Sequence, residues 1–233
     1  MLQIRDLYCG YGDITVLREI NFEIGKGETL ALVGSNGAGK TTLLMSIAGH
    51  ILPKSGQVTL EGVDLASTDP NKRCGLGVGL VPEGRRIFPD LTVFENLVVG
   101  GYSRPYEKQA ENIDRVVDIF PRLLDRQKQL AGSLSGGEQQ MLAFGRAMMS
   151  NPSLMLVDEL SLGLMPSVVE ECYKALGKLV EKGIAVILVD QNSDAAMVFC
   201  SNSLILETGH QLWYGKSSKA PKRPFSSFDS INP

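Results

Sequence analysis

The feature that most constrains the fold of this 233-residue chain is a glycine-rich segment, residues 34–41, with the pattern G-x-x-x-x-G-K-[ST]. An apolar run at residues 29–33 precedes it, and a helical pattern at residues 40–48, ended by Gly49, follows it. A buried strand, a glycine-rich loop and a helix in this order are typical of a phosphate-binding loop, whose converging N–H groups surround phosphate oxygens. The residues that we expect to bind a nucleotide here are Gly34, Ser35, Asn36, Gly37, Ala38, Gly39, Lys40, Thr41 and Thr42.

Strand and helix patterns alternate along most of the chain. Apolar or alternating runs predict further strands at residues 2–7, 20–24, 57–60, 76–81, 154–157, 185–189 and 204–206. Helical patterns occur at residues 92–99, 106–120, 137–149 and 166–180. Alternating strands and helices indicate a parallel sheet, interrupted here by a helical insertion at residues 90–150. At residues 217–233, where basic residues, proline and serine gather without periodicity, we expect a poorly ordered tail.

Composition restricts the partners and the compartment. The net charge is −3, whereas nucleic-acid binding usually needs a basic excess, so we expect no nucleic-acid partner. Four scattered cysteines favour a reducing compartment and no structural metal. A charge interrupts the first residues, so we expect no signal peptide. No apolar run approaches the roughly 18–20 residues of a membrane helix.

Two carboxylates follow the apolar run at residues 154–157. Asp158, at the carboxyl end of this strand, is placed to meet the Mg²⁺ held by Thr41, and Glu159 to polarise a water that attacks the γ-phosphate. Taken alone, an acidic pair after a strand more commonly marks the point where the strand leaves the core. The phosphate-binding loop upstream favours the catalytic interpretation.

A second anion-binding segment lies at residues 134–140, which read LSGGEQQ. A serine and two glycines at a helix start leave N–H groups free at the positive end of the helix dipole. A phosphate-binding loop, then this segment, then a strand ending in Asp-Glu resembles the ATP-binding subunits of ABC transporters. The resemblance covers residues 1–216.

The resemblance implies a P-loop NTPase (RecA-like) α/β core, an antiparallel β lobe and an inserted α-helical subdomain. It implies ATP and Mg²⁺ as cofactors. It also implies a second ATP-binding subunit packed head to tail, whose nucleotide meets Ser135, Gly136 and Gly137 of this chain. Whether that subunit is a copy of this chain or a similar one stays open.

Further site residues follow from the resemblance. Tyr11 matches the aromatic that stacks on adenine, although a packing tyrosine in a turn is the alternative. Lys40, Glu159 and Gln191 are the expected catalytic residues. The expected metal ligands are Thr41, Asp158 and Glu83.

The chain departs from the general family pattern at two of these positions. Glu83 stands in the Q-loop where glutamine is usual, and Gln191 stands at the switch where histidine is usual. A glutamine can hydrogen-bond the γ-phosphate but cannot act as a general acid or base near neutral pH. The charge of Glu83 either strengthens Mg²⁺ binding or slows activation of the water. One hypothesis is therefore a subunit that does not hydrolyse ATP.

These departures are similar to one subgroup, the short LIV-type ATP-binding protein of branched-chain amino-acid import. The matching stretches are PEGRR-x-F-P, SLGL-x-P and the Gln-Asn after the last core strand. The subgroup implies transmembrane permease subunits as partners, an indirect link to a periplasmic substrate-binding protein, and a peripheral place on the cytoplasmic face of the inner membrane. Phe88 packs either in the cleft that receives a permease helix or in the core of its own lobe.

Three alternatives remain at this point. Relatives that import urea or short amides share much of the pattern. A regulatory subunit that closes on ATP but scarcely hydrolyses it fits Gln191. A soluble ABC ATPase that acts on nucleic acid or the ribosome fits worse, because such proteins usually carry two cassettes or a long coiled-coil insertion.

Overall fold

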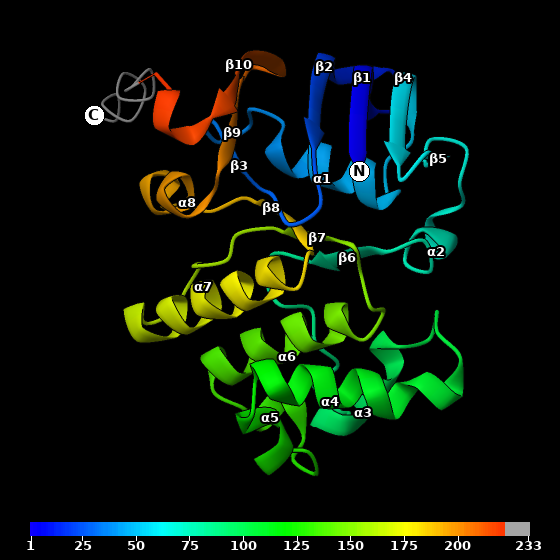
Figure 1. Ribbon diagram of the computed structural model, residues 1–233, viewed down its shortest axis with the longest axis vertical. Coiled ribbons are helices and arrows are strands. Elements are labelled where there is room, and N and C mark those ends of the chain that lie inside the picture. The colour runs from blue at the N-terminus through cyan, green and yellow to red at the C-terminus, as the bar shows by residue number, and fades with distance from the viewer. Residues whose placement is uncertain (222–233) are drawn as a thin grey trace.

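The computed structural model describes residues 1–221, and Figure 1 shows how their elements are arranged. The strands are β1 (Leu2–Tyr11), β2 (Ile14–Ile24), β3 (Thr29–Val33), β4 (Pro53–Leu60), β5 (Val63–Asp64), β6 (Val78–Val81), β7 (Leu154–Val157), β8 (Ala185–Leu188), β9 (Asn202–Glu207) and β10 (His210–Lys216). The helices are α1 (Lys40–Ala48), α2 (Pro70–Arg73), α3 (Val93–Gly100), α4 (Gln109–Ile119), α5 (Arg122–Asp125), α6 (Gly136–Met148), α7 (Pro166–Glu181) and α8 (Ser193–Phe199). Short 3-10 turns are η1 (Tyr106–Lys108), η2 (Ala131–Ser133) and η3 (Ser217–Lys219).

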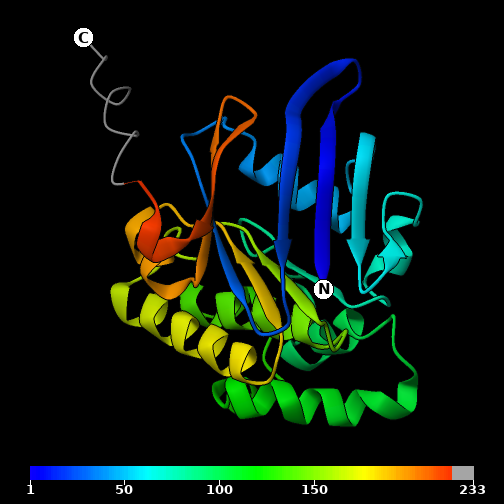
Figure 2. The same ribbon diagram turned by 45° about the horizontal axis from the view of Figure 1, so that its top comes forward.

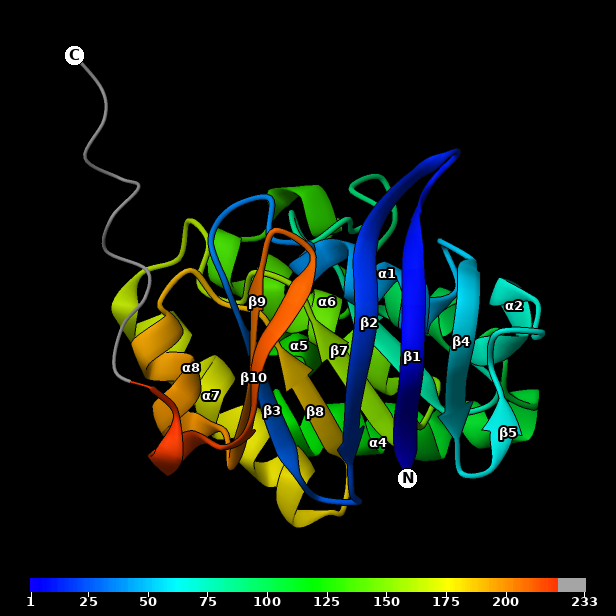
Figure 3. The same ribbon diagram turned by 90° about the horizontal axis from the view of Figure 1, so that it is seen from above.

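The strands form one mixed sheet in the order β5-β4-β1-β2-β10-β9-β3-β8-β7-β6 (Figure 3). From β9 to β6 the neighbours are parallel, whereas β1 pairs antiparallel with β2 and β4. The two parts meet at β10, which pairs antiparallel with β9 and joins β2 through the pair His210 and Arg18. Because the carboxyl ends of parallel strands lie at one edge, the segments after β3, β6, β7 and β8 come together there.

The parallel strands carry a hydrophobic core on each face. In β3, Ala31 and Val33 belong to the cluster that holds the buried residues of α6 and α7, while Leu30 and Leu32 belong to the cluster of α1 and the antiparallel strands. This alternation follows from the two-residue period of a strand. Helix α1 therefore lies between the parallel strands and the antiparallel layer, and α6 and α7 cover the opposite face (Figures 1 and 2).

Between β6 and β7 the ordered elements are all helical and lie together at one end of the molecule (Figure 1). A capping box begins α3: the Thr92 hydroxyl accepts from the Glu95 N–H at 3.2 Å, and the Glu95 carboxylate accepts from the Thr92 N–H at 2.7 Å. The buried Asn96 amide exchanges two 2.9 Å hydrogen bonds with the backbone of Phe88. These hydrogen bonds thus fix the segment before α3, at Phe88, to the first turn of α3.

The predicted fold class, a P-loop core with an antiparallel lobe and inserted helices, is confirmed. The helix expected at residues 106–120 is divided into η1 and α4, and strand β10 was not anticipated. Residues 217–219, at the start of the expected tail, form a 3-10 turn. Residues 222–233 lie outside the described residues.

Candidate functional site

The glycine-rich loop at residues 34–41 connects β3 to α1 and leaves the start of the helix open. Gly39, the N-cap of α1, has φ +104° and provides no side-chain cap, and Gly37 has φ +79°. At Gly34 a Cβ would lie 2.4 Å from the Leu206 carbonyl oxygen, so only glycine fits there without a shift of the backbone. The first N–H groups of α1 therefore lack side-chain acceptors, which is the geometry that binds a phosphate.

The Lys40 side chain folds back over the glycine-rich loop that precedes it. Its Nζ donates hydrogen bonds to the carbonyl oxygens of Gly34 at 2.8 Å and Ser35 at 3.0 Å. Burial lowers the pKa of this ammonium, and the carboxylates of Glu159 and Asp158 oppose the shift. The lysine is held at the mouth of the loop by neutral carbonyls, which phosphate oxygens can replace with stronger charge-assisted hydrogen bonds.

Asp158, directly after β7, is 1% exposed and lies beside the start of α1. Its Oδ1 accepts a weak hydrogen bond from the Thr41 hydroxyl at 3.5 Å, and its buried Oδ2 has no hydrogen-bond partner. Burial raises the pKa of this carboxyl, the Thr41 hydrogen bond and Lys40 oppose the rise, and Glu83 adds to it. An unpartnered carboxylate oxygen next to a hydroxyl is a donor set that suits Mg²⁺. No cluster of three or more His, Cys, Asp or Glu side chains that could hold a metal by itself occurs within residues 1–221.

Glu159 follows in a strained backbone position, with φ +56°. Its N–H donates to the Val189 carbonyl at 3.0 Å, which fixes the residue at the end of β8, and its Oε2 is buried without a partner. Burial raises the pKa of its carboxyl, and the charge of Asp158 adds to the rise. A carboxylate with a raised pKa is a stronger base than an ordinary one, as a group that takes a proton from water requires.

The end of β8 presents Asp190 and Gln191. Asp190 is buried, and its carboxylate accepts from the hydroxyls of Ser161 and Tyr173, the latter at 3.1 Å, and from the Asn192 N–H at 3.0 Å. The Gln191 side chain is exposed and makes none of the hydrogen bonds found in residues 1–221. Gln191 is thus free to reach a ligand at the same edge of the sheet.

The LSGGEQQ segment begins α6 and is built differently. Ser135 is the N-cap: its hydroxyl accepts from the Glu138 N–H at 3.3 Å and donates to the Glu138 carboxylate at 2.8 Å. The hydrogen bonds of Ser135 all stay within its own helix, and no hydrogen bond in the described chain joins it to the glycine-rich loop. The two predicted anion sites are therefore separate, and Ser135 is exposed to solvent.

Tyr11 and Phe88 are both surface residues. Tyr11 is the last residue of β1 and is 55% exposed, so its ring is not used for packing in the core. The Phe88 ring is 42% exposed and lies under the Arg146 guanidinium, 4.5 Å from its carbon to the ring centroid. Phe88 is therefore not a core residue of the helical lobe, nor does it line the cleft described next.

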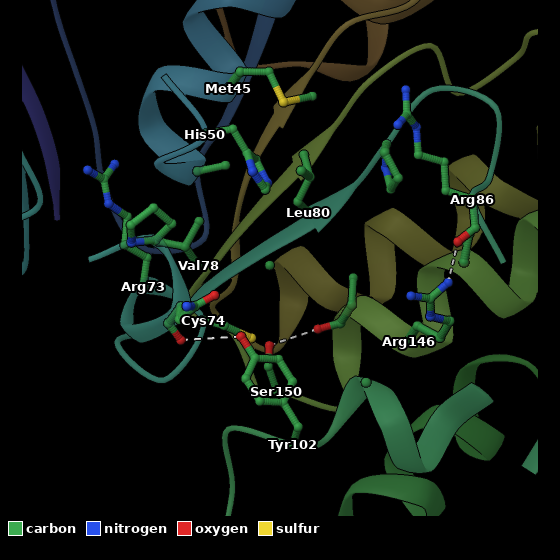
Figure 4. A pocket seen from close by; sticks show the side chains of 18 of the residues that line it. Met45, His50, Arg73, Cys74, Val78, Leu80, Arg86, Tyr102, Arg146 and Ser150 are labelled. Carbon is green, nitrogen blue, oxygen red and sulfur yellow. Dashed lines mark hydrogen bonds between the residues drawn. The ribbon is translucent and has the colours of Figure 1, made fainter. Parts of the chain in front are cut away.

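A cleft of about 670 Å³ separates α1 and α2 from the helical insertion (Figure 4). Met45, His50, Leu80, Tyr102 and Arg146 are among the residues that line it, and none of its lining residues is acidic. The resemblance implied a cleft for a permease helix, but sequence patterns did not locate its walls, because they come from separate segments. Arg73, on its α2 side, is 1% exposed and donates to the carbonyl oxygens of Ser46 and Ile47 at 2.7 and 3.0 Å, which caps α1.

No helix of residues 1–221 has both the length and the apolar character needed to cross a membrane.

Curated relatives match the chain over nearly its full length. It is 42% identical over 209 residues to the high-affinity branched-chain amino acid transport ATP-binding protein BraG of Pseudomonas aeruginosa, covering 90% of each chain. It is 35% identical over 220 residues to the probable branched-chain amino acid transport ATP-binding protein LivF of Archaeoglobus fulgidus, covering 94% of this chain and 93% of that one. A Nod factor export ATP-binding protein of Rhizobium etli is 31% identical, covering 92% and 68%.

Solved structures agree on the fold. An ATP-binding subunit of an ABC transporter superposes with a TM-score of 0.82 at 27% identity, covering 93% of this chain and 90% of that one. A dimeric ATP-binding cassette in a post-hydrolysis state, bound to ADP and phosphate, superposes with a TM-score of 0.80 at 24% identity, covering 93% and 99%. The family model described as ABC transporter matches residues 17–161, which include the glycine-rich loop, the LSGGEQQ segment and the acidic pair. The chain is therefore a member of the ABC transporter family and an ATP-binding subunit within it.

Proposed function

We propose that this protein is the ATP-hydrolysing subunit of an importer for branched-chain amino acids. The observation that carries the proposal is the pair of the buried Asp158 and the half-buried Glu159, each with one buried carboxylate oxygen free, at the edge of the sheet where the glycine-rich loop opens. The similarity to BraG and LivF supports the cargo.

The residues of the site bind different parts of ATP and Mg²⁺. Residues 34–39 and Thr42 hold the phosphates together with Lys40, and Tyr11 stacks on adenine. Thr41 and Asp158 would hold Mg²⁺, with Glu83 near them, and the ion would supply positive charge against the phosphates. Glu159 accepts a proton from the attacking water, and its raised pKa supports that role. Gln191 hydrogen-bonds the γ-phosphate from the end of β8.

The exposed start of α6 serves a second subunit. Because Ser135, Gly136 and Gly137 are separate from the nucleotide site of their own chain, they bind the nucleotide of a partner packed head to tail. ATP binding then closes the dimer across these residues, and hydrolysis reopens it. The dimeric state of a solved cassette with the same fold is consistent with a dimer.

The cleft beside the helical insertion receives the permease. It lies next to the turn that follows β6, so a permease segment seated there contacts the loop that carries Glu83 (Figure 4). No acidic residue lines the cleft, so its walls do not repel an acidic occupant. The subunit thus lies on the cytoplasmic face of the inner membrane, and a periplasmic substrate-binding protein acts on it through the permease.

The Gln191 amide, which cannot act as a general acid or base, favours one second candidate, a regulatory subunit that closes on ATP with little hydrolysis. Urea, short amides or an exported cargo are rival substrates, the last because of the similarity to a Nod factor export ATP-binding protein. Uptake of labelled leucine and labelled urea, with and without this chain beside its permease, separates these cargoes.

The Glu159→Gln variant tests the catalytic assignment. The amide cannot take a proton, so we expect phosphate release to fall at least about 1000-fold while ATP still drives dimerisation. Glu181→Gln, at the exposed end of α7, is the matched control and should retain full turnover. A Glu159→Gln protein that stays monomeric with ATP contradicts the shared site. A wild-type protein that closes without releasing phosphate supports the regulatory candidate.

A further inference from the structure

The turn after β6 is held in an unfavourable backbone conformation. Three consecutive residues, Gly84, Arg85 and Arg86, have left-handed φ values of +73°, +66° and +45°. Such values disfavour residues with a side chain, and each of them costs about 1 kcal/mol or more. Contacts elsewhere must therefore hold this turn in place.

The first of those contacts is made by the Arg85 side chain, which lies on the first turn of α6. Its Nη1 donates to the Gln139 Oε1 at 3.1 Å, and a Cβ placed on Gly136 would lie 3.1 Å from its Nη2. The Gln139 amide in turn donates to the Leu134 carbonyl at 3.2 Å. A chain of contacts thus leads from Arg85 through Gln139 to the residue directly before Ser135.

A second anchor fixes the backbone but not the side chain of the next residue. Arg146 Nη1 donates to the Arg86 carbonyl at 2.5 Å, farther along α6 (Figure 4). The Arg86 side chain itself is exposed and makes none of the hydrogen bonds found in residues 1–221. Two adjacent arginines in the same backbone region therefore differ in one respect: only Arg85 reaches the start of α6.

The other end of the same turn lies at the metal site. Strand β6, which leads into the turn, pairs with β7: Val81 lies opposite Val157, and the Asp158 N–H donates to the Val81 carbonyl at 2.9 Å, two residues before Glu83. The turn is short, so a movement of Glu83 toward or away from Asp158 displaces Arg85 as well. Glu83, Gly84, Arg85 and Gln139 thus connect the nucleotide site of this chain to the segment that meets the nucleotide of the partner.

We infer that Arg85 is a positioning residue that couples the two halves of the composite ATP site, by setting the position of residues 134–137 according to the state of the Glu83 turn. The inference rests on the proposed head-to-tail dimer. It concerns a side chain that touches neither nucleotide. Its loss should therefore leave ATP binding to the single subunit unchanged and weaken closure of the dimer.

The test uses the full-length chain with Glu159→Gln as parent, so that hydrolysis does not reopen the dimer. Arg85→Gln and Arg86→Gln are compared on this parent, because each removes one guanidinium from a left-handed position. Binding of a fluorescent ATP analogue is measured at protein concentrations too low for dimers. ATP-driven dimerisation is then measured by sedimentation velocity, and thermal midpoints report folding.

For Arg85→Gln we expect analogue affinity within about twofold of the parent and dimerisation weakened about tenfold or more, the effect of one lost charge-assisted hydrogen bond. Arg86→Gln should match the parent in both measurements. Gln139→Ala should weaken dimerisation like Arg85→Gln, and the double variant should add little, because the two side chains act in series. This non-additivity would not arise from general destabilisation.

The inference is overturned if the two arginine variants dimerise alike, if Arg85→Gln weakens analogue binding as much as dimerisation, or if the effects of Arg85→Gln and Gln139→Ala add in full. Should Arg85→Gln fail to fold, Gln139→Ala alone still decides, since an unchanged dimerisation constant contradicts the coupling. A parent that stays monomeric with ATP refutes the proposed dimer itself, and the coupling with it.

Discussion

The two loops that we propose as anion-binding sites are built in opposite ways. The loop at residues 34–41 is surrounded by its own chain: Lys40 is bonded to its carbonyls, and Asp158 presents a buried, unpartnered oxygen. In the loop at residues 135–137, Ser135 is exposed and the two glycines are half-buried, and the capping box of Ser135 and Glu138 satisfies the helix start. The first loop is completed by a ligand, whereas the second is complete as a helix start and gains a ligand only from outside.

The two loops therefore affect the stability of the protein in different ways. Buried carboxylates without full partners destabilise the ligand-free core, and a ligand removes that penalty. The capping box stabilises α6 in every state of the protein. Substitutions in the first loop should therefore change nucleotide affinity, and substitutions in the second should change dimerisation with little effect on the single subunit.

The largest effect is expected for Lys40→Ala. The variant removes the ammonium whose hydrogen bonds pass from neutral carbonyls to phosphate oxygens when ATP binds. The ATP affinity of the single subunit should therefore fall about 1000-fold. Titration with a fluorescent ATP analogue measures it. Lys26→Ala removes an exposed ammonium paired with Glu61 and should leave the affinity unchanged. Equal losses for the two lysines would show that the first loop does not depend on its own charge.

Ser135→Asp should have the next largest effect, and on the other quantity. Aspartate is a good N-cap, so the free energy of unfolding should change by less than about 1 kcal/mol. Its charge would face the γ-phosphate of the partner, so ATP-driven dimerisation of the Glu159→Gln parent should weaken about 100-fold. Ser133→Asp, on the exposed turn η2, is the control. If Ser135→Asp instead abolished analogue binding by the single subunit, the two loops would not be separate sites.

Asp158→Asn should give opposite changes in stability and function. Removing a buried charge with an unpartnered oxygen should raise the thermal midpoint of the ligand-free protein by about 2–4 °C, which corresponds to about 1 kcal/mol in a chain of this size. With ATP present, Mg²⁺ should stabilise the wild-type protein. The apparent affinity of the variant for Mg²⁺ should be about tenfold lower. Asp114→Asn, exposed on α4, should change neither quantity. A lower midpoint for Asp158→Asn would show that the ionised carboxylate already stabilises the empty site.

The sequence indicated the first loop in full because its pattern is local. The buried strand, the glycines and the helix follow one another within residues 29–49, so no distant contact is needed to recognise them. Strand β10 was missed because its residues are only partly buried and become a strand through pairing with β9. Helix α8 was missed because it has seven residues and one buried position, Ala196.

The walls of the cleft and the contacts of Arg73, Arg85 and Arg146 also could not be predicted. Each of these arginines bonds to a residue at least five positions away, and Arg85 reaches Gln139 across 54 positions. Periodicity treats such residues as exposed charges. Ser135 was recognised for its anion site, but its bond to Glu138 gives the same residue a structural task that a motif match does not reveal.

The smallest effect is expected at Gly137, and it separates these two tasks. A Cβ at this position would lie 2.9 Å from both Cγ atoms of Val168 at the start of α7, so Gly137→Ala should destabilise the fold by about 1 kcal/mol. Adding Val168→Ala makes room, so the double variant should regain most of the thermal midpoint relative to Val168→Ala alone. Its ATP-driven dimerisation should still be weakened, because the methyl group also stands where the partner's nucleotide approaches the helix. Full recovery of dimerisation would mean that Gly137 is needed only for the packing of α6 on α7 within its own chain, and not for the approach of the partner's nucleotide.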